Sequence, residues 1–309
     1  CNTKSKKQRF VELFASTGCV ASCAALSPNG KTLVLGCKTT KPCVSNSIFL
    51  WDVPSAMAAK EQSKLTTKKQ LIQEEVDIPP NAVIESAHPK EVTMVSVSVL
   101  RGAIVSCDDE TAVKFWSAEG VPLVKISTSQ LKNNQMASSP DGRFMTVATN
   151  MEDVHIWEAV VKKSSSGSAE FSHGFEGITK RLGAIGHKRT VIKVSFGGAE
   201  FPWFFCTASL DMTLRLWQLS EICDRSNPVQ LFSVPLEEVG QLIAVALSRH
   251  APPFIALAFR DQVDVLSGID GSRVIRIPKP EGEIRSIAWV GDFIGISTSH
   301  KCVFLSIPK

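Results

Sequence analysis

A histidine, a hydroxyl residue and an aspartate lie in one short stretch of the chain and together could perform acid–base chemistry. They are His187, Thr207 and Asp211, and Trp217 follows six residues after the aspartate. An imidazole placed between a hydroxyl and a carboxylate activates the nucleophile of many hydrolases. A nucleophile must be exposed to its substrate, however, and the pattern of this stretch places the hydroxyl between strands. We therefore predict that these residues do not form a catalytic triad.

The sequence contains none of the other motifs that would indicate an enzyme or a metal site. It lacks an H-x-x-x-H, a G-x-S-x-G and a G-x-x-x-x-G-K motif. Its nine cysteines include no C-x-x-C pair, which argues against a disulfide framework and a zinc ribbon. Cys19 and Cys23 would face the same way on a strand, but two ligands without a second pair do not make a metal site. We predict a non-enzyme with reduced thiols, no metal and no cofactor.

The charge of the chain is nearly balanced, with 34 basic residues, 30 acidic residues and a net charge of +4. This balance favours a mixed, solvated surface over a dedicated anion-binding one. An RNA-associated protein is the alternative, and lysines in the 4–9 and 59–84 segments would serve it, but aromatic residues that could stack on bases are not interleaved with them. No apolar run is long enough to span a membrane, so we predict no membrane span in this chain.

The elements that must position these residues repeat along the chain. Four segments end in the pattern apolar, variable, apolar, Trp, and their tryptophans are Trp51, Trp116, Trp157 and Trp217. Two later copies, at residues 262–266 and 302–305, carry Leu in place of Trp. Such alternation is typical of a half-buried strand, and a period near 40 residues is typical of a propeller.

Turn signals upstream of these strands indicate antiparallel hairpins. Residues 27–30 read Ser-Pro-Asn-Gly and residues 139–142 read Ser-Pro-Asp-Gly. Proline presets the backbone angle at the second position of a turn, and glycine tolerates the exit from it. Each copy of the repeat therefore predicts a blade made of consecutive antiparallel strands.

We predict an all-β propeller at residues 17–309, preceded by an N-terminal segment at 1–16. Six blades are recognisable, at residues 17–58, 87–127, 135–161, 186–232, 240–277 and 282–307. Polar insertions at 59–84 and 162–175 interrupt the period and are predicted to be exposed loops. Residues 10–14 are a candidate strand for closing the ring, because propellers usually pair strands from their two ends.

The fourth blade resembles the WD-repeat signature. Gly186-His187 lies 30 residues before Trp217, and Asp211 lies six before it. In WD repeats the histidine, a Ser or Thr, the tryptophan and the turn aspartate form a buried hydrogen-bonded chain. The resemblance implies this structural role for His187, Thr207, Asp211 and Trp217.

The second blade departs from this signature. Ala87-His88 and Trp116 are present, but Glu110 stands where the turn aspartate is expected, with Asp108 and Asp109 just before it. We therefore expect an incomplete network in blade two. The remaining blades lack the histidine, so a complete network is expected in blade four alone.

The central blades further resemble the transducin beta-like protein 2 family. Four stretches match that family in order and spacing, and all of them precede Gly186-His187. They are residues 119–124, 130–134, 139–144 and 153–158. The resemblance implies seven WD-repeat blades, with one blade and a hydrophobic membrane anchor lying before Cys1. It also implies a non-catalytic scaffold on the cytosolic side of the endoplasmic reticulum, linked to translational control. Its expected partners are proteins, among them a stress-response kinase.

Overall fold

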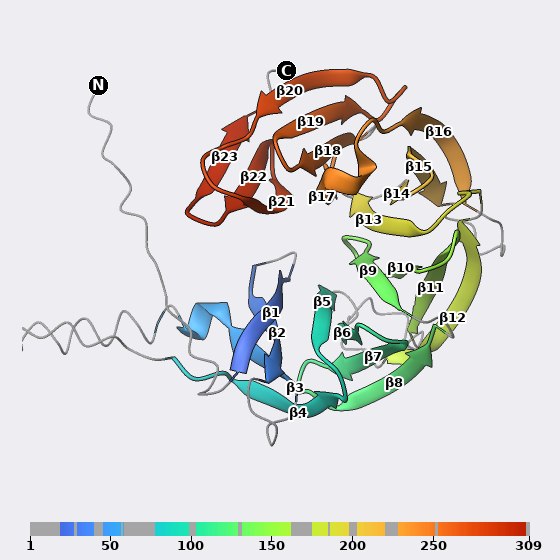
Figure 1. The fold of residues 1–309 in the computed structure, drawn as a ribbon. Helices are drawn as coiled ribbons and strands as arrows, with labels where there is room; N and C mark the ends of the chain where they lie inside the picture. The colour runs from blue at the N-terminus through green and yellow to red at the C-terminus, as the bar shows by residue number, and fades with distance from the viewer. Residues whose placement is uncertain are drawn as a thin grey trace, which may run out of the picture.

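The strands of the protein form six sheets that follow one another in chain order around a common centre (Figure 1). The computed structural model describes residues 19–27, 30–39, 46–56, 58, 78–98, 103–128, 132–161, 175–184, 186–197, 203–219, 228–250 and 253–306. Within these residues every strand pairing is antiparallel and joins strands that are neighbours in the sequence. The structure thus confirms the all-β propeller, and each sheet is called a blade below.

Blades one to three each contain four strands. Blade one consists of β1 (Cys19–Leu26), β2 (Thr32–Thr39), β3 (Asn46–Asp52) and β4 (Ala82–His88). Blade two consists of β5 (Val92–Ser98), β6 (Ala103–Asp108), β7 (Ala112–Ser117) and β8 (Pro122–Ser127). Blade three consists of β9 (Asn133–Ser138), β10 (Phe144–Thr149), β11 (Val154–Val161) and β12 (Phe175–Ala184).

Blades four and five also contain four strands, and blade six shows three in the described part of the chain. Blade four consists of β13 (Val191–Gly197), β14 (Trp203–Ser209), β15 (Thr213–Leu219) and β16 (Val229–Pro235). A short helix, η1 (Val239–Gln241), leads into blade five, which consists of β17 (Leu242–Leu247), β18 (Phe254–Phe259), β19 (Gln262–Ser267) and β20 (Arg273–Pro278). Blade six consists of β21 (Ile284–Val290), β22 (Phe293–Thr298) and β23 (Cys302–Ser306).

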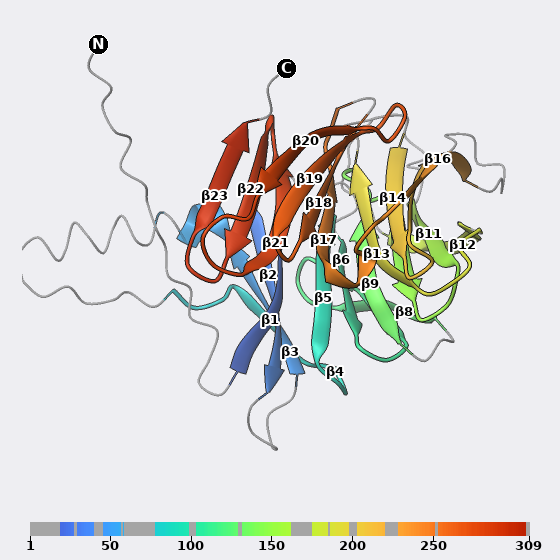
Figure 2. The same cartoon turned by 45° about the horizontal axis from the view of Figure 1, so that its top comes forward.

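Burial differs systematically between the strands of a blade. Every residue of the second strands β6, β10 and β14 is buried, whereas the fourth strands β8, β16 and β20 alternate between exposed and half-buried residues. The first strands lie innermost and pack side by side from β1 through β21 (Figures 1 and 2). Within the described ranges β21 and β1, at the two ends of this series, do not pack against each other in that way.

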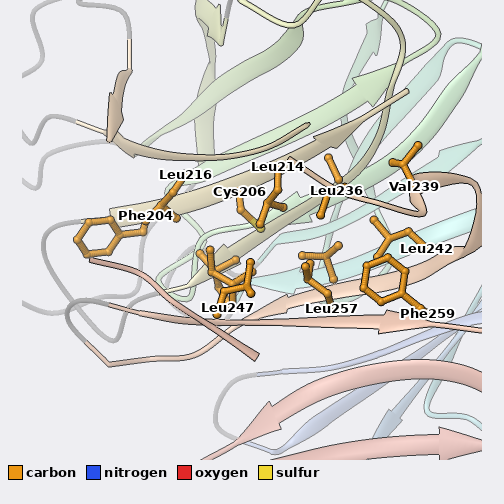
Figure 3. Close-up of a cluster of buried hydrophobic side chains, with 14 residues drawn as sticks. Phe204, Cys206, Leu214, Leu216, Leu236, Val239, Leu242, Leu247, Leu257 and Phe259 are labelled. Atoms are coloured by element: carbon orange, nitrogen blue, oxygen red, sulfur yellow. The ribbon is translucent and has the colours of Figure 1, made fainter. Parts of the chain in front are cut away.

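The hydrophobic core lies between neighbouring blades. Figure 3 shows the cluster between blades four and five, in which Leu214 and Leu216 of β15 lie against Leu247 and Leu257 of the next blade. Burying a side chain of this size contributes about 1.5–3 kcal/mol. The cluster around Trp51 lies within blade one, but the other core clusters each draw on two neighbouring blades, so the blades stabilise one another.

The turn at residues 139–142 has the conformation that its sequence predicts. The N–H of Gly142 donates to the carbonyl of Ser139 over 2.8 Å, and Gly142 has a φ of 68°, which glycine adopts without strain. The Ser139 hydroxyl accepts the N–H of Phe144 over 2.9 Å. Ser27 makes the matching contact with the N–H of Thr32 in blade one. The predicted antiparallel hairpins are confirmed at both places.

Several predicted boundaries shift in the structure. β4 begins at Ala82, inside the insertion expected at 59–84, and ends at His88, which was assigned to blade two. Blade three extends beyond its predicted end at residue 161, because β12 adds a fourth strand. Other predicted features lie outside the described residues: the N-terminal segment 1–16 with its closing strand 10–14 and its lysines, residues 59–77 and 162–174 of the insertions, and Ile307.

Candidate functional site

The structure brings together the four side chains that the WD-repeat resemblance singled out in blade four. The Trp217 indole N–H donates to the Thr207 hydroxyl over 2.8 Å. That hydroxyl lies 2.7 Å from Nε2 of His187, and Nδ1 of His187 lies 2.9 Å from the Asp211 carboxylate. An ionised carboxylate can only accept, so Nδ1 carries the proton and Nε2 accepts from the hydroxyl. The four groups form one directed chain of hydrogen bonds.

The strands and the turn of blade four fix these positions. Thr207 lies on β14 and Trp217 on β15, and Asp211 occupies the turn between these strands. Besides His187, Asp211 accepts the Thr213 hydroxyl over 2.7 Å and the backbone N–H groups of Thr213 and Lys188 over 3.0 and 2.9 Å. The carboxylate therefore joins the turn to the segment that enters β13.

The electrostatics of this network match its hydrogen bonds. Burial alone would raise the pKa of Asp211, but hydrogen bonds from Thr213, Lys188 and His187 outweigh it and hold that pKa well below its usual range. For His187, burial lowers the pKa, although Asp211 acts in the opposite direction. The stable pair is thus an ionised carboxylate and a neutral imidazole.

Blade two contains a second complete network, which corrects the expectation that Glu110 leaves it incomplete. His88 lies 2.8 Å from the Ser106 hydroxyl, which also accepts the Trp116 indole N–H over 2.8 Å. The acid is Asp108, whose carboxylate lies 3.1 Å from Nδ1 of His88. Glu110 instead lies on the surface, where it pairs with Lys90 over 3.5 Å.

The acid that bonds to the histidine lies two residues earlier in blade two than in blade four. Asp108 is the last residue of β6 and is buried, whereas Glu110 lies in the turn that follows and is exposed. The matching position in blade four is Ser209, whose hydroxyl donates to the carbonyl of Arg189 over 2.7 Å. The signal that was available in the sequence is Ser106, which precedes Trp116 by ten residues as Thr207 precedes Trp217.

The other two repeat tryptophans are buried without such a network in the described residues. Trp51 donates its indole N–H to the carbonyl of Ile78 over 3.1 Å. Trp157 packs against Met136, Met145 and Val147 in the cluster between blades two and three. Trp157 fills the space between two sheets, whereas Trp51 packs within blade one.

Neither network is arranged for nucleophilic catalysis. Thr207 and Ser106 are completely buried, and each hydroxyl is already bonded to a tryptophan and a histidine. A substrate carbonyl cannot approach a hydroxyl that is enclosed between strands. The polar chemistry of both blades is used to hold turns in place.

The cysteines of the described residues are free thiols. A β-bulge between Ala21 and Cys23 changes the register of β1, so that Cys19 joins the cluster around Trp51 while Cys23 faces blade two. This corrects the expectation that the two thiols face the same way. Within the described part of the chain, no group of three or more potential metal ligands comes together.

A cavity of about 220 Å³ opens where the first strands end, at the centre of the ring. All six blades contribute to its wall, through Leu26, Val97, Ser138, Gly197, Leu247 and Trp289. Arg249, at the rim, is the one charged side chain that lines it in the described structure. We call this cavity the channel mouth.

Comparison with known proteins agrees with the geometry. Human transducin beta-like protein 2 is 26% identical to this chain over 199 residues, which are 63% of this chain and 42% of the human protein. The chain thus spans less than half the length of that relative. No protein-family model matches the sequence.

The solved structures with similar folds include propellers. The β-propeller domain of Cps50 (Swd1) from Myceliophteria thermophila superposes with a TM-score of 0.62 at 11% identity, covering 93% of this chain and 82% of that one. A chain of the mitotic checkpoint complex gives a TM-score of 0.65 at 13% identity, covering 95% and 76%. The chain has the β-propeller fold. As for membrane insertion, no helix in the described ranges has the length and apolar character that a crossing requires.

Proposed function

We propose that this WD-repeat chain is a non-catalytic scaffold that binds other proteins. The observation that carries the proposal is the contrast between its interior and its surface. Both Ser/Thr–His–Asp networks are sealed inside blades, whereas the turn tips and the channel mouth expose apolar and charged side chains. Rigid sheets that present loops in fixed positions favour binding over chemistry.

The likeness to transducin beta-like protein 2 suggests which partners the scaffold binds and where in the cell it acts. We propose that the partners include a stress-response kinase and that the chain acts on the cytosolic side of the endoplasmic reticulum, in translational control. This part rests on the family resemblance alone. A kinase that engages the propeller would meet the channel mouth on one face or the turns between second and third strands on the other.

The test is quantitative affinity purification from cells, with the wild-type chain compared with Arg249→Glu. Reversing the charge at the rim should deplete partners that bind the channel mouth while leaving the fold intact, because the residue is exposed. Lys125→Glu is the control, since Lys125 is an exposed cation on the outer strand β8, away from both of these surfaces. Recovery of no reproducible protein partner by the wild-type chain would contradict the scaffold.

A further inference from the structure

Three exposed apolar side chains gather on the face opposite the channel mouth, in the turns of blades three and four. Met151 is 43% exposed, Leu210 is 38% exposed and Met212 is 43% exposed. They lie in the turns that join second to third strands, whereas the channel mouth lies where the first strands end. Lys188 and Arg189, both exposed, enter β13 between these turns. We call these five residues the turn patch.

Hydrogen bonds join the parts of the turn patch into one rigid surface. The N–H of Leu210 donates to the carbonyl of Thr190 over 2.9 Å, and the N–H of Val191 donates to the carbonyl of Met151 over 3.0 Å. The Thr190 hydroxyl donates to the carbonyl of Asn150 over 3.1 Å. The segment that carries Lys188 and Arg189 is thus bonded to the turns on both sides of it.

The buried network holds this surface from below. Asp211 lies between Leu210 and Met212 and bonds to His187 and to the N–H of Lys188. The Ser209 hydroxyl bonds to the carbonyl of Arg189. The N–H of Leu236, which belongs to the core cluster of Figure 3, donates to the carbonyl of Met212 over 2.7 Å. A partner therefore meets side chains whose backbone is already ordered, which reduces the entropy lost on binding.

Met212 has a backbone conformation that is uncommon for a long side chain, in a turn where its N–H donates to the carbonyl of Ser209 over 3.1 Å. Its φ is 65°, in the left-handed region that glycine or asparagine occupies far more easily than a long side chain. Residues held in this region are strained, and strained residues cluster at functional sites. The Met212 side chain is flexible and polarizable, and it lies at the tip of the turn in contact with solvent.

The charges around the turn patch select the chemistry of its ligand. The side chains of Lys188 and Arg189 are exposed, and both are cations that a carboxylate could contact. Glu152 and Asp153 follow Met151 in the blade-three turn, and Glu237 and Glu238 follow Leu236. Acidic groups thus border the patch beyond its apolar side chains, and they repel an acidic ligand that is displaced from the central cations.

We propose that the turn patch docks a short protein segment in which apolar side chains flank an acidic residue. The carboxylate would lie against Lys188 and Arg189, and the apolar side chains would cover Met151, Leu210 and Met212. The proposal deepens the scaffold function and rests on it. It names the surface and the chemistry of one class of partner.

The test is selection of short peptides from a phage-displayed random library on the folded wild-type chain, followed by binding measurements on synthetic copies. Enriched peptides should carry an acidic residue between apolar ones, and replacing the acid by its amide should weaken binding by about tenfold, as expected for one lost charged contact. Enriched peptides that lack this pattern, or that bind equally well as amides, would overturn the proposal.

Met212→Gly separates docking from stability. Glycine relieves the strain at this position, so the variant should resist urea as well as or better than the wild type and yet bind the peptides about tenfold more weakly. Arg189→Glu should weaken binding in the same way. Ile269→Ser is the matched control, because Ile269 is a 75% exposed apolar residue in the turn between β19 and β20, on the opposite face. Equal peptide binding by wild type, Met212→Gly and Arg189→Glu would refute the turn patch.

The scaffold and the turn patch can fail separately. The turn patch would be excluded if Met212→Gly and Arg189→Glu bound the peptides as well as the wild type does. The scaffold would still stand if protein partners were recovered from cells and reduced by Arg249→Glu. Recovery of no protein partner at all would contradict the scaffold, whatever the peptides do.

Discussion

The carboxylate of Asp108 lies 3.1 Å from Nδ1 of His88 and also accepts the backbone N–H groups of Glu110 and Ala112. One acid at the end of β6 thus orients the histidine and closes the turn that follows. Burial would raise the pKa of Asp108, but the hydrogen bond and charge of His88, together with those N–H groups, lower it. The carboxylate is a structural part of blade two.

Replacing Asp108 by alanine should destabilise the protein by about 1–3 kcal/mol, because buried donors on His88 and in the turn lose their acceptor. Asp211→Ala should have an effect of similar size in blade four. Urea denaturation followed by tryptophan fluorescence measures both. Glu110→Ala is the control: Glu110 is 53% exposed and its ion pair with Lys90 is on the surface, so the change should be under about 1 kcal/mol. A larger loss for Glu110→Ala than for Asp108→Ala would show that blade two uses the other acid.

Stability should fall as the pH is lowered from neutral. The pKa of His187 is lowered from its ordinary 6.5, so the folded protein keeps this imidazole neutral while the unfolded chain takes up a proton below about pH 6.5. The lowered pKa values of Asp211 and Asp108 add a second loss below their ordinary 3.8, since protonation then favours the unfolded state. Urea midpoints measured from neutral to acidic pH should decline in this order.

The contribution of His187 to this pH dependence is isolated by His187→Asn. This variant should be less stable than the wild type at neutral pH, but it should lose less stability between neutral and mildly acidic conditions. Parallel pH profiles for the two proteins would show that His187 does not contribute.

Gly197 should not tolerate even one added methyl group. A Cβ at this position would lie 2.4 Å from Cβ of Leu247 and 2.6 Å from the carbonyl oxygen of Ser248, so two blades would have to separate. Gly197→Ala should therefore cost about 1–3 kcal/mol. Gly240→Ala is the matched control, because a Cβ there meets no atom within 4 Å. Thermal denaturation of both variants decides the point, and equal melting temperatures would contradict the close approach of β13 to blade five.

The thiols should differ sharply in their reactivity. Cys302 is exposed, whereas Cys206 is fully buried and burial raises the pKa of its thiol well above the ordinary value. Because the thiolate is the reactive form, iodoacetamide should label Cys302 in the native protein and Cys206 only after unfolding. Burial also raises the pKa of Cys23 to about 11, which should slow its reaction. Peptide mass spectrometry resolves each site, and early labelling of Cys206 would mean that blade four opens readily.

The strands and turns that recur in each blade were predictable from the sequence, because every copy needs the same alternation of apolar residues and the same turn residues. The tryptophan strands and the Ser-Pro turns follow from alternation and backbone geometry, and the sequence places both correctly. Asp108 was not identified because the signature fixes a position in the turn, whereas the network requires only a carboxylate within hydrogen-bond distance of Nδ1 of His88. β12 has no tryptophan and follows a polar insertion, so no periodic signal marks it.

The turn patch and the bulge in β1 depend on contacts between segments that are distant in the sequence. Leu210 and Met212 flank Asp211 in the sequence, yet only the three-dimensional structure shows that Thr190 and Val191 connect them to the turn of Met151. Likewise, the bulge that turns Cys23 away from Cys19 brings Cys23 within 3.4 Å of the carbonyl of Val92 in blade two. Neighbouring blades determine these details, and a pattern within one repeat does not encode them.

The pairing of each strand with its neighbour in the sequence has a consequence for synthesis. Each blade can complete its hydrogen-bond ladders soon after it emerges from the ribosome, without waiting for a distant segment, so the contacts that limit folding are more local than in most all-β proteins. Its apolar faces stay uncovered until the following blade is made. The most recently completed blade of the nascent chain therefore exposes an apolar, aggregation-prone face. A chaperone would act on that face.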